Sequence, residues 1–145
     1  MSIEALHLQV SSRLVISGRI WRRFCQANLS KFGISEACFG PLLTIGRLGD
    51  GVRQVQVAQA IGIEGPSLVR LLDQLCAAGL IERHQDASDR RAKVLSVTDA
   101  GRKAREKLEE ELIELRHRAL SHLSEDDLRA ALRVFDAFDQ CSQAE

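Results

Sequence analysis

The sequence predicts a mainly α-helical domain with one small β-hairpin. Apolar residues recur at three- and four-residue steps along most of the 145-residue chain, and glycines separate the helical segments. Only two short stretches, 80–84 and 93–97, have a β-like pattern, and a polar loop at 85–92 joins them. With 45% hydrophobic and 28% charged residues, the composition is that of a globular protein, and the length suits a single domain.

The N-terminal third is predicted to form two helices. The first spans 3–32 and ends at Gly33, a residue type that commonly follows a helix C-terminus. Ser35 has the character of an N-cap for the second helix. Because Pro41 falls inside that second run, a distortion of the helix is expected there.

Four further helices are expected after a glycine-rich turn at 49–51. Two short ones are predicted at 54–62 and 67–78, and Thr98 is expected to cap a long fifth helix. Ser124 to Asp127 has the form of a capping box that opens the last helix. The fifth helix carries an apolar seam long enough to require a partner helix: Ala104, Leu108, Leu112, Leu115 and Ala119.

Charge is balanced overall but unevenly distributed. Twenty basic and twenty acidic residues give a net charge of zero, which argues against a simple polycation that coats nucleic acid or membrane. Residues 1–52 carry +3, residues 53–93 carry +1 and residues 94–145 carry −4. Contacts with DNA are therefore expected outside the acidic last third. No apolar run is long enough for a membrane span and no signal peptide is recognised, so a cytoplasmic protein is predicted.

The four cysteines, Cys25, Cys38, Cys76 and Cys141, include no pair with metal-site or redox-motif spacing. His117 and His122 are five residues apart and do not share a helix face, so neither a metal nor a cofactor is expected. We interpret Cys25, Cys76 and Cys141 as small core residues on apolar helix faces. The alternative is a redox sensor at Cys25 or Cys38, which would need an exposed thiolate of low pKa.

The most informative stretch is 54–97, which reads in order as helix, turn, helix, strand, basic loop and strand. Ala58 is small where the two helices would cross, and Gly62 lies where the chain must turn with positive φ. A basic hairpin directly after such a pair predicts a winged helix-turn-helix that binds DNA.

Polar residues of the second of these helices point away from its apolar face. If the leucines at 68, 71, 72 and 75 face inward, then Ser67, Arg70 and Gln74 face outward. Ser67 lies at the helix N-terminus, where it is suited to bind a phosphate, and Pro66 allows close approach to the DNA backbone. Arg70 has the geometry to read guanine in the major groove. The alternative is a solvated surface on which Arg70 pairs with Asp73.

Arginines lie at the tip of the predicted hairpin. Arg90 or Arg91 at such a tip is suited to enter the minor groove, and Lys93 is suited to meet phosphates. Asp89 lies two residues before Arg91, so we expect its carboxylate to orient that guanidinium. The alternative is a plain solvated turn.

Several of these runs resemble the MarR family of bacterial transcription regulators, and most of all its SlyA-like branch. The resemblance lies in residues 62–75, 79–83, 87–93 and 95–98, with Asp89-x-Arg91 as its most specific part, and in residues 19–22 of the first helix. It implies an obligate homodimer of triangular outline. Residues 1–34 and 99–145 would form the dimerisation helices, and 35–98 the winged helix-turn-helix lobe.

The resemblance also implies a small-molecule site, with one departure. The branch usually has a His-Trp pair where this chain has Cys38-Phe39, which argues against simple aromatic carboxylates such as salicylate. The candidate pocket wall for a small aromatic or phenolic effector consists of Arg13, Trp21, Cys25, Phe39 and Leu43; the alternative is that these residues are ordinary interface core.

We therefore predict a homodimeric, sequence-specific regulator that binds a pseudo-palindromic operator in double-stranded DNA and responds to a ligand. A redox-switched regulator using Cys25 or Cys38 is the main alternative. A winged helix that binds only protein is another. A small hydrolase or transferase is disfavoured because the sequence offers no nucleophile–base–acid set, no phosphate-binding glycine loop and no metal ligands.

Overall fold

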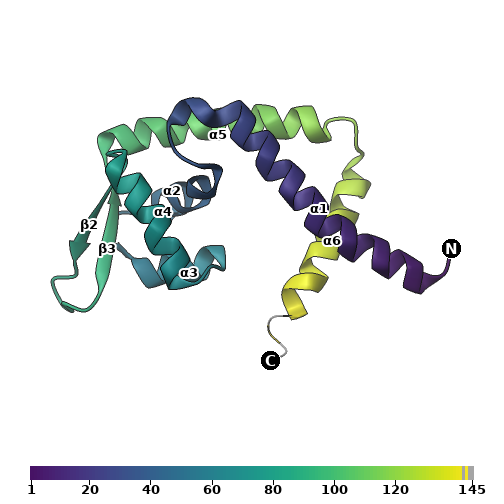
Figure 1. The fold of residues 1–145 in the computed structure, drawn as a ribbon, viewed down its shortest axis with the longest axis horizontal. Coiled ribbons are helices and arrows are strands. Elements are labelled where there is room, and N and C mark those ends of the chain that lie inside the picture. The colour runs from purple at the N-terminus through teal and green to yellow at the C-terminus, as the bar shows by residue number, and fades with distance from the viewer. Residues whose placement is uncertain (142, 144–145) are drawn as a thin grey trace. The chain divides into compact units, whose positions relative to one another are not determined.

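The computed structural model describes residues 1–141 and 143, in two compact units, Met1–Glu111 and Leu112–Glu145, whose boundary falls within a helix (Figure 1). Residues 142, 144 and 145 of the predicted dimerisation segment 99–145 lie outside the described residues. The helices and strands follow in the order α1 (Ile3–Leu29), η1 (Ser30–Phe32), η2 (Glu36–Cys38), α2 (Phe39–Leu48), β1 (Val52–Arg53), α3 (Gln54–Ile61), α4 (Gly65–Ala77), β2 (Ile81–Gln85), β3 (Lys93–Val97), α5 (Asp99–Leu120) and α6 (Glu125–Cys141). The predicted mainly helical fold with a small β wing is confirmed.

Helix α1 begins at Ile3, as its sequence predicts, but ends at Leu29, three residues before the predicted end. The Ser2 hydroxyl accepts a hydrogen bond from the Ala5 amide at 3.2 Å, which satisfies one of the unpaired N–H groups of the first turn. The last turn tightens into the 3-10 helix η1, and Gly33 then adopts a left-handed conformation with φ of 70°. This conformation is unfavourable for residues with a Cβ, which explains the glycine.

The start of α2 differs from the prediction. Ser35 has an extended backbone but makes no side-chain cap, and a 3-10 helix, η2, stands between it and α2. Pro41 is the third residue of α2, within the first turn, where the missing N–H has no partner inside the helix anyway. The run predicted after Ser35 is thus divided into η2 and α2 just before Pro41, and from there α2 continues unbroken to Leu48.

Helices α3 and α4 form the predicted helix-turn-helix. The turn begins at Gly62, whose φ is 69° and whose amide donates to the Ala58 carbonyl at 2.9 Å. Helix α4 begins at Gly65, two residues before the predicted start at 67, so Pro66 lies in its first turn. One face of the pair packs into the core through fully buried side chains: Val57, Leu68, Leu72 and Leu75.

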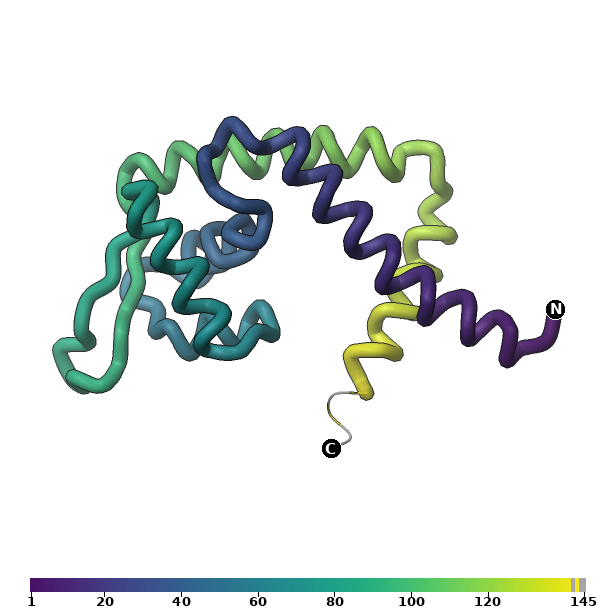
Figure 2. Tube along the Cα trace, in the orientation of Figure 1, coloured from purple at the N-terminus to yellow at the C-terminus, as the bar shows by residue number. Residues whose placement is uncertain are grey.

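Three antiparallel strands follow one another in space as β1, β3 and β2. Leu95 in the central strand is opposite Val52 on one side and Arg83 on the other. Figure 2 traces the hairpin from β2 through its loop and back along β3. The hairpin matches the prediction, whereas β1 was not predicted because two residues are too few to show an alternating pattern.

Strand β3 passes almost directly into α5. The Thr98 hydroxyl accepts from the Gly101 amide at 3.0 Å and donates to the Gly79 carbonyl at 2.7 Å, so Thr98 caps α5 as predicted and joins it to the end of α4. Gly101 is buried here, and a Cβ on it would lie 1.9 Å from the Leu80 carbonyl oxygen. Only glycine permits this close approach of helix and strand.

The second unit contains the end of α5 and all of α6. The predicted capping box is confirmed: the Asp127 amide donates to the Ser124 hydroxyl at 3.2 Å, and the Ser124 amide donates to the Asp127 carboxylate at 3.1 Å. The Ser124 hydroxyl also donates to the Asp127 carboxylate at 2.6 Å, and this bond, followed by the one from the Ser124 amide, lowers the pKa of Asp127. Cys141 at the end of α6 is exposed, so its interpretation as a core residue was wrong.

The apolar seam of α5 spans the boundary of the two units. Ala104 is half-buried and Leu108 is buried in the first unit, and Leu112 and Leu115 are buried in the second. None of the described helices combines the length and the apolarity that crossing a lipid bilayer requires.

Candidate nucleic-acid interface

Helix α4 separates an apolar face from a polar one, as its sequence predicts. Leu68, Leu72 and Leu75 are fully buried, whereas Pro66, Ser67 and Arg70 are exposed. Pro66 and Ser67 lie in the first turn, where backbone N–H groups point outward and the helix dipole favours an anion. Arg70 follows one turn later. This exposed N-terminal half has the composition of a helix that reads a DNA groove.

Arg70 does not form the ion pair with Asp73 that was the alternative interpretation. Asp73 instead accepts a hydrogen bond from Arg83 on β2, and this contact raises the pKa of Arg83. Within the described residues Arg70 has no ion-pair partner. Its guanidinium is therefore available to a ligand, and Asp73 joins α4 to the wing.

Gln74 is exposed as predicted, but its carbonyl oxygen is occupied. The Ser35 hydroxyl donates to Gln74 Oε1 at 2.9 Å, and the Cys38 thiol lies 3.3 Å from the same atom. The thiol also lies 3.7 Å from the Leu71 carbonyl. The amide nitrogen of Gln74 takes no part in these contacts, which fix α4 against η2.

The loop between β2 and β3 is organised by Asp86. Its Oδ1 accepts from the Ser88 amide and hydroxyl, both at 2.9 Å, and its Oδ2 lies 2.8 Å from Arg53 Nη2. The bonds from Ser88, and after them the contact with Arg53, hold the pKa of Asp86 below its ordinary value of 3.8. The base of the wing is thus attached to the end of β1. Sequence reasoning did not identify either Arg53 or Asp86.

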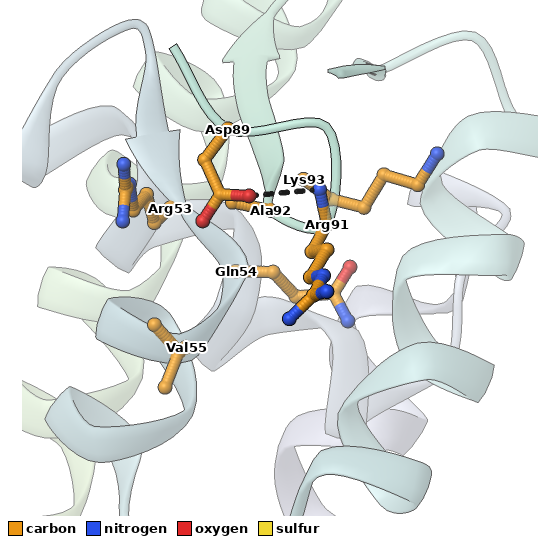
Figure 3. Close-up of a pocket in the computed structure, with 7 residues that line it drawn as sticks. All are labelled: Arg53, Gln54, Val55, Asp89, Arg91, Ala92 and Lys93. Atoms are coloured by element: carbon orange, nitrogen blue, oxygen red, sulfur yellow. Dashed lines mark hydrogen bonds between the residues drawn. The ribbon is translucent and has the colours of Figure 1, made fainter. Parts of the chain in front are cut away.

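Asp89 meets Arg91 differently from the prediction. The Asp89 carboxylate accepts a hydrogen bond from the backbone amide of Arg91 at 3.0 Å, drawn as the dashed line in Figure 3. The expected bond to the Arg91 guanidinium is not the contact observed. The reason is geometric, since a carboxylate two residues before an N–H closes a local turn. Asp89 therefore shapes the loop, and the guanidinium of Arg91 extends away from it.

The basic side chains of the wing are exposed. Arg90, Arg91 and Lys93 all face solvent, and none of them has an ion pair within the part of the chain that the structure describes. They lie at or beside the end of the hairpin. Local geometry thus presents two arginines and a lysine as unneutralised cations.

An open pocket of about 300 Å³ lies between the wing and the start of α3 (Figure 3). Asp89, Arg91, Ala92 and Lys93 line it from the wing side. Arg53, Gln54 and Val55 line it from the β1–α3 side. The sequence signal that could have indicated Arg53 is its place directly before α3, where its amide donates to the Gln56 side chain at 2.9 Å.

The residues predicted to line an effector pocket differ in exposure. Cys25 and Phe39 are buried, Leu43 and Trp21 are half-buried, and Arg13 is exposed. The Trp21 ring packs against Phe24 at a centroid distance of 5.8 Å. Buried Cys25 and Phe39 fit the alternative of ordinary core as well as they fit a pocket wall.

Cys38, the other candidate redox residue, is also fully buried. A thiolate sensor must be exposed to its oxidant. Because Cys25 and Cys38 are both buried, neither meets that requirement in this structure. Among the described residues there is also no cluster of His, Cys, Asp and Glu suited to a metal ion.

A helix-turn-helix followed by an antiparallel hairpin with a basic loop defines the winged-helix class of DNA-binding domains. Residues 32–92 match the model of the MarR family. The chain is 30% identical to the transcriptional regulator PA3341, with a TM-score of 0.80 over 94% of this chain and 99% of that one. It belongs to the MarR family.

Two further solved structures share the fold. A mutant MarR from E. coli in complex with operator DNA is 19% identical, with a TM-score of 0.82 over 95% of this chain and 99% of that one. CouR from Rhodococcus jostii RHA1, bound to p-coumaroyl-CoA, is 22% identical, with a TM-score of 0.78 over 89% of this chain and 90% of that one. The SlyA-like branch remains a prediction.

Proposed function

We propose that this protein is a sequence-specific regulator that binds a pseudo-palindromic operator in double-stranded DNA as a homodimer in the cytoplasm. The observation that carries the proposal is a set of cations on one lobe that form no ion pair with any residue the structure describes: Arg70 on α4 and Arg90 and Arg91 on the wing. They are exposed, whereas Arg83 nearby forms an ion pair with Asp73. The E. coli relative bound to operator DNA supports the same use of the fold.

In this proposal the lobe reads both grooves. The N-terminal half of α4 enters the major groove, where Arg70 donates a bidentate pair of hydrogen bonds to guanine and Ser67 binds a phosphate beside Pro66. The wing enters the neighbouring minor groove with Arg91, and Arg90 accompanies it at the tip. Lys93 binds a phosphate, Asp89 holds the backbone of the loop, and the Gln74 amide donates to DNA at the far end of the helix.

Dimerisation is proposed for segments 1–34 and 99–145 because they expose apolar side chains that a monomer leaves uncovered. No residue of α6 is buried, and Phe135 is 47% and Leu132 59% exposed. In α1, seven large apolar residues are also exposed: Ile3, Leu6, Leu8, Val10, Val15, Ile16 and Ile20. Apolar area of this extent, on helices that both flank the DNA-binding lobe in sequence, is suited to a second copy of the chain.

We propose a small aromatic or phenolic effector as the ligand to which the regulator responds. CouR binds an aromatic CoA ester, which shows that this fold accommodates such a molecule. Arg13, Trp21, Cys25, Phe39 and Leu43 remain the proposed pocket wall. Effector binding would act by shifting the population of dimers away from the lobe spacing that fits the operator.

A redox-switched regulator is the second candidate, and one contact favours it for Cys38. The Cys38 thiol is bonded to Gln74 and to the Leu71 carbonyl, both on α4, so its oxidation would disturb the helix proposed to read DNA. Counting free thiols before and after peroxide treatment, and repeating the binding assay, tests this candidate. Unchanged operator affinity after oxidation of Cys38 would exclude it.

The central experiment selects bound sequences from a random pool of duplex DNA and then measures affinity for the selected operator. An inverted repeat is expected, since each lobe of a symmetric dimer would read one half-site. Arg70→Ala should weaken operator binding by roughly 1–3 kcal/mol per lobe and relax selectivity at one position, and Arg91→Ala should weaken it and reduce the salt dependence. Arg47→Ala, on the exposed surface of α2, is the matched control. Wild-type affinity in both Arg70→Ala and Arg91→Ala would refute the proposal.

A further inference from the structure

The pocket between the wing and α3 differs from the surfaces assigned so far because two separate segments build it. Three cationic side chains, Arg53, Arg91 and Lys93, surround it with a single carboxylate, Asp89. One oxygen of that carboxylate is already bonded to the Arg91 amide. The lining is therefore positive overall, and its chemistry favours an anion with several oxygen acceptors.

We propose that this pocket receives one phosphate of the DNA backbone, and that Arg53 and Gln54 are its ligands from the β1–α3 junction. The inference rests on the proposed function, since it takes DNA as the partner, but it adds residues from a segment outside α4 and the wing. The volume of about 300 Å³ is ample for a phosphate group with its attached sugar edge. Arg91 and Lys93 border the same pocket from the wing side.

Arg53 is positioned for this task by its other contact. Its Nε lies 3.0 Å and its Nη2 2.8 Å from Asp86 Oδ2, which orients the guanidinium plane. The side chain is still 42% exposed, so the guanidinium has N–H groups that face solvent and remain free to donate. A guanidinium held by a carboxylate on one edge and open on another is suited to bind a phosphate without losing further side-chain freedom.

Gln54 supplies a neutral donor at the same place. It is the first residue of α3, and its side-chain amide lies on the pocket side in Figure 3, below Asp89 and close to the path of Arg91 in that view. In that view the charged ends of Arg53 and Lys93 lie on opposite sides, and the Arg91 side chain lies between them beside Gln54.

The test measures operator affinity against salt concentration for wild type and Arg53→Gln, using the duplex obtained by selection. Removing one phosphate contact per lobe should lower the steepness of log affinity against log salt by about one per lobe, or about two for a dimer. Affinity should fall roughly tenfold per lobe. Arg53→Lys should restore most of the salt dependence because it keeps the charge.

Asp86→Asn is the matched control for a purely structural role of Arg53. It breaks the same ion pair, leaves the Arg53 charge in place and keeps an amide oxygen for Ser88. The phosphate role predicts an unchanged or steeper salt dependence for Asp86→Asn. Equal losses in Arg53→Gln and Asp86→Asn, or an unchanged salt dependence in Arg53→Gln, would overturn the inference.

A second measurement locates the phosphate. A series of operator duplexes is prepared, each with one backbone phosphate replaced by a neutral methylphosphonate. At one position per half-site, this replacement should lower the affinity of wild type but not that of Arg53→Gln. The absence of such a position refutes the inference while leaving DNA binding intact. A wild type that does not prefer the selected operator over a scrambled duplex refutes the proposed function itself, so the two failures are distinguishable.

Discussion

Replacing Gly101 with alanine should destabilise the protein although alanine is the better helix former. Gly101 lies in the first turn of α5, where a Cβ would be 1.9 Å from the Leu80 carbonyl oxygen and 2.7 Å from a methyl carbon of Val97. Neither distance is compatible with non-bonded contact, and a backbone carbonyl cannot rotate aside as a flexible side chain can. The helix or the strand must therefore move.

The size of the effect follows from two opposing contributions. Alanine gains up to about 1 kcal/mol over glycine in a helix interior. Overpacking costs about 1–3 kcal/mol, and displacing the Leu80 carbonyl also breaks its 3.1 Å hydrogen bond from the Thr98 amide, which is worth about 1 kcal/mol. The expected net loss is about 1–3 kcal/mol in the free energy of unfolding.

Urea denaturation followed by circular dichroism measures this loss directly. Gly40→Ala is the matched control, since Gly40 is also helical, has ordinary φ and has nothing within 4 Å of an added Cβ. It should be neutral or slightly stabilising. If Gly101→Ala proved as stable as Gly40→Ala, the argument that helix and strand are in unavoidable contact at this point would be refuted.

Two further predictions concern the wing and the dimer. Because hydrogen bonds from Ser88 lower the pKa of Asp86, its stabilising contribution is complete above the unfolded value of about 3.9 and is lost as pH falls through the lower folded value. The Ser88 amide resonance of wild type should therefore titrate below pH 3.8, and the same resonance in Asp86→Asn should not; identical titrations would contradict the assignment. Phe135→Glu on α6 should raise the dimer dissociation constant by at least about thirtyfold, equivalent to about 2 kcal/mol, when measured by sedimentation velocity, with Gln140→Glu as the exposed polar control. An unchanged dissociation constant would exclude α6 from the interface.

Regular elements could be predicted from the sequence where their pattern is local. The apolar periodicity around Leu68, Leu72 and Leu75 predicted α4 and its exposed face, and Thr98 and Ser124 predicted the starts of α5 and α6. Each of these signals depends on residues within one or two turns. Local chemistry therefore suffices to place them.

The remaining features depend on partners that are distant in sequence. Gln74 faces outward as its periodicity requires, but the hydroxyl that occupies it belongs to Ser35, 39 residues earlier. Arg53 and Asp86 are 33 residues apart, and neither has a local feature that indicates the other. The two-residue spacing of Asp89 and Arg91 also does not distinguish a hydrogen bond to the Arg91 side chain from one to its backbone. In the structure the Asp89 carboxylate accepts from the backbone amide of Arg91.

Helix α4 is fastened along both of its flanks, through Asp73 to Arg83 on β2 and through Gln74 to Ser35 beside η2. A helix so attached cannot slide or roll by itself without breaking a polar contact on one side. Within one lobe, the position of α4 relative to the wing is therefore fixed. A regulatory signal that leaves these contacts intact can change the distance between the two lobes of a dimer. It cannot change the spacing between the groove contacts that each lobe makes.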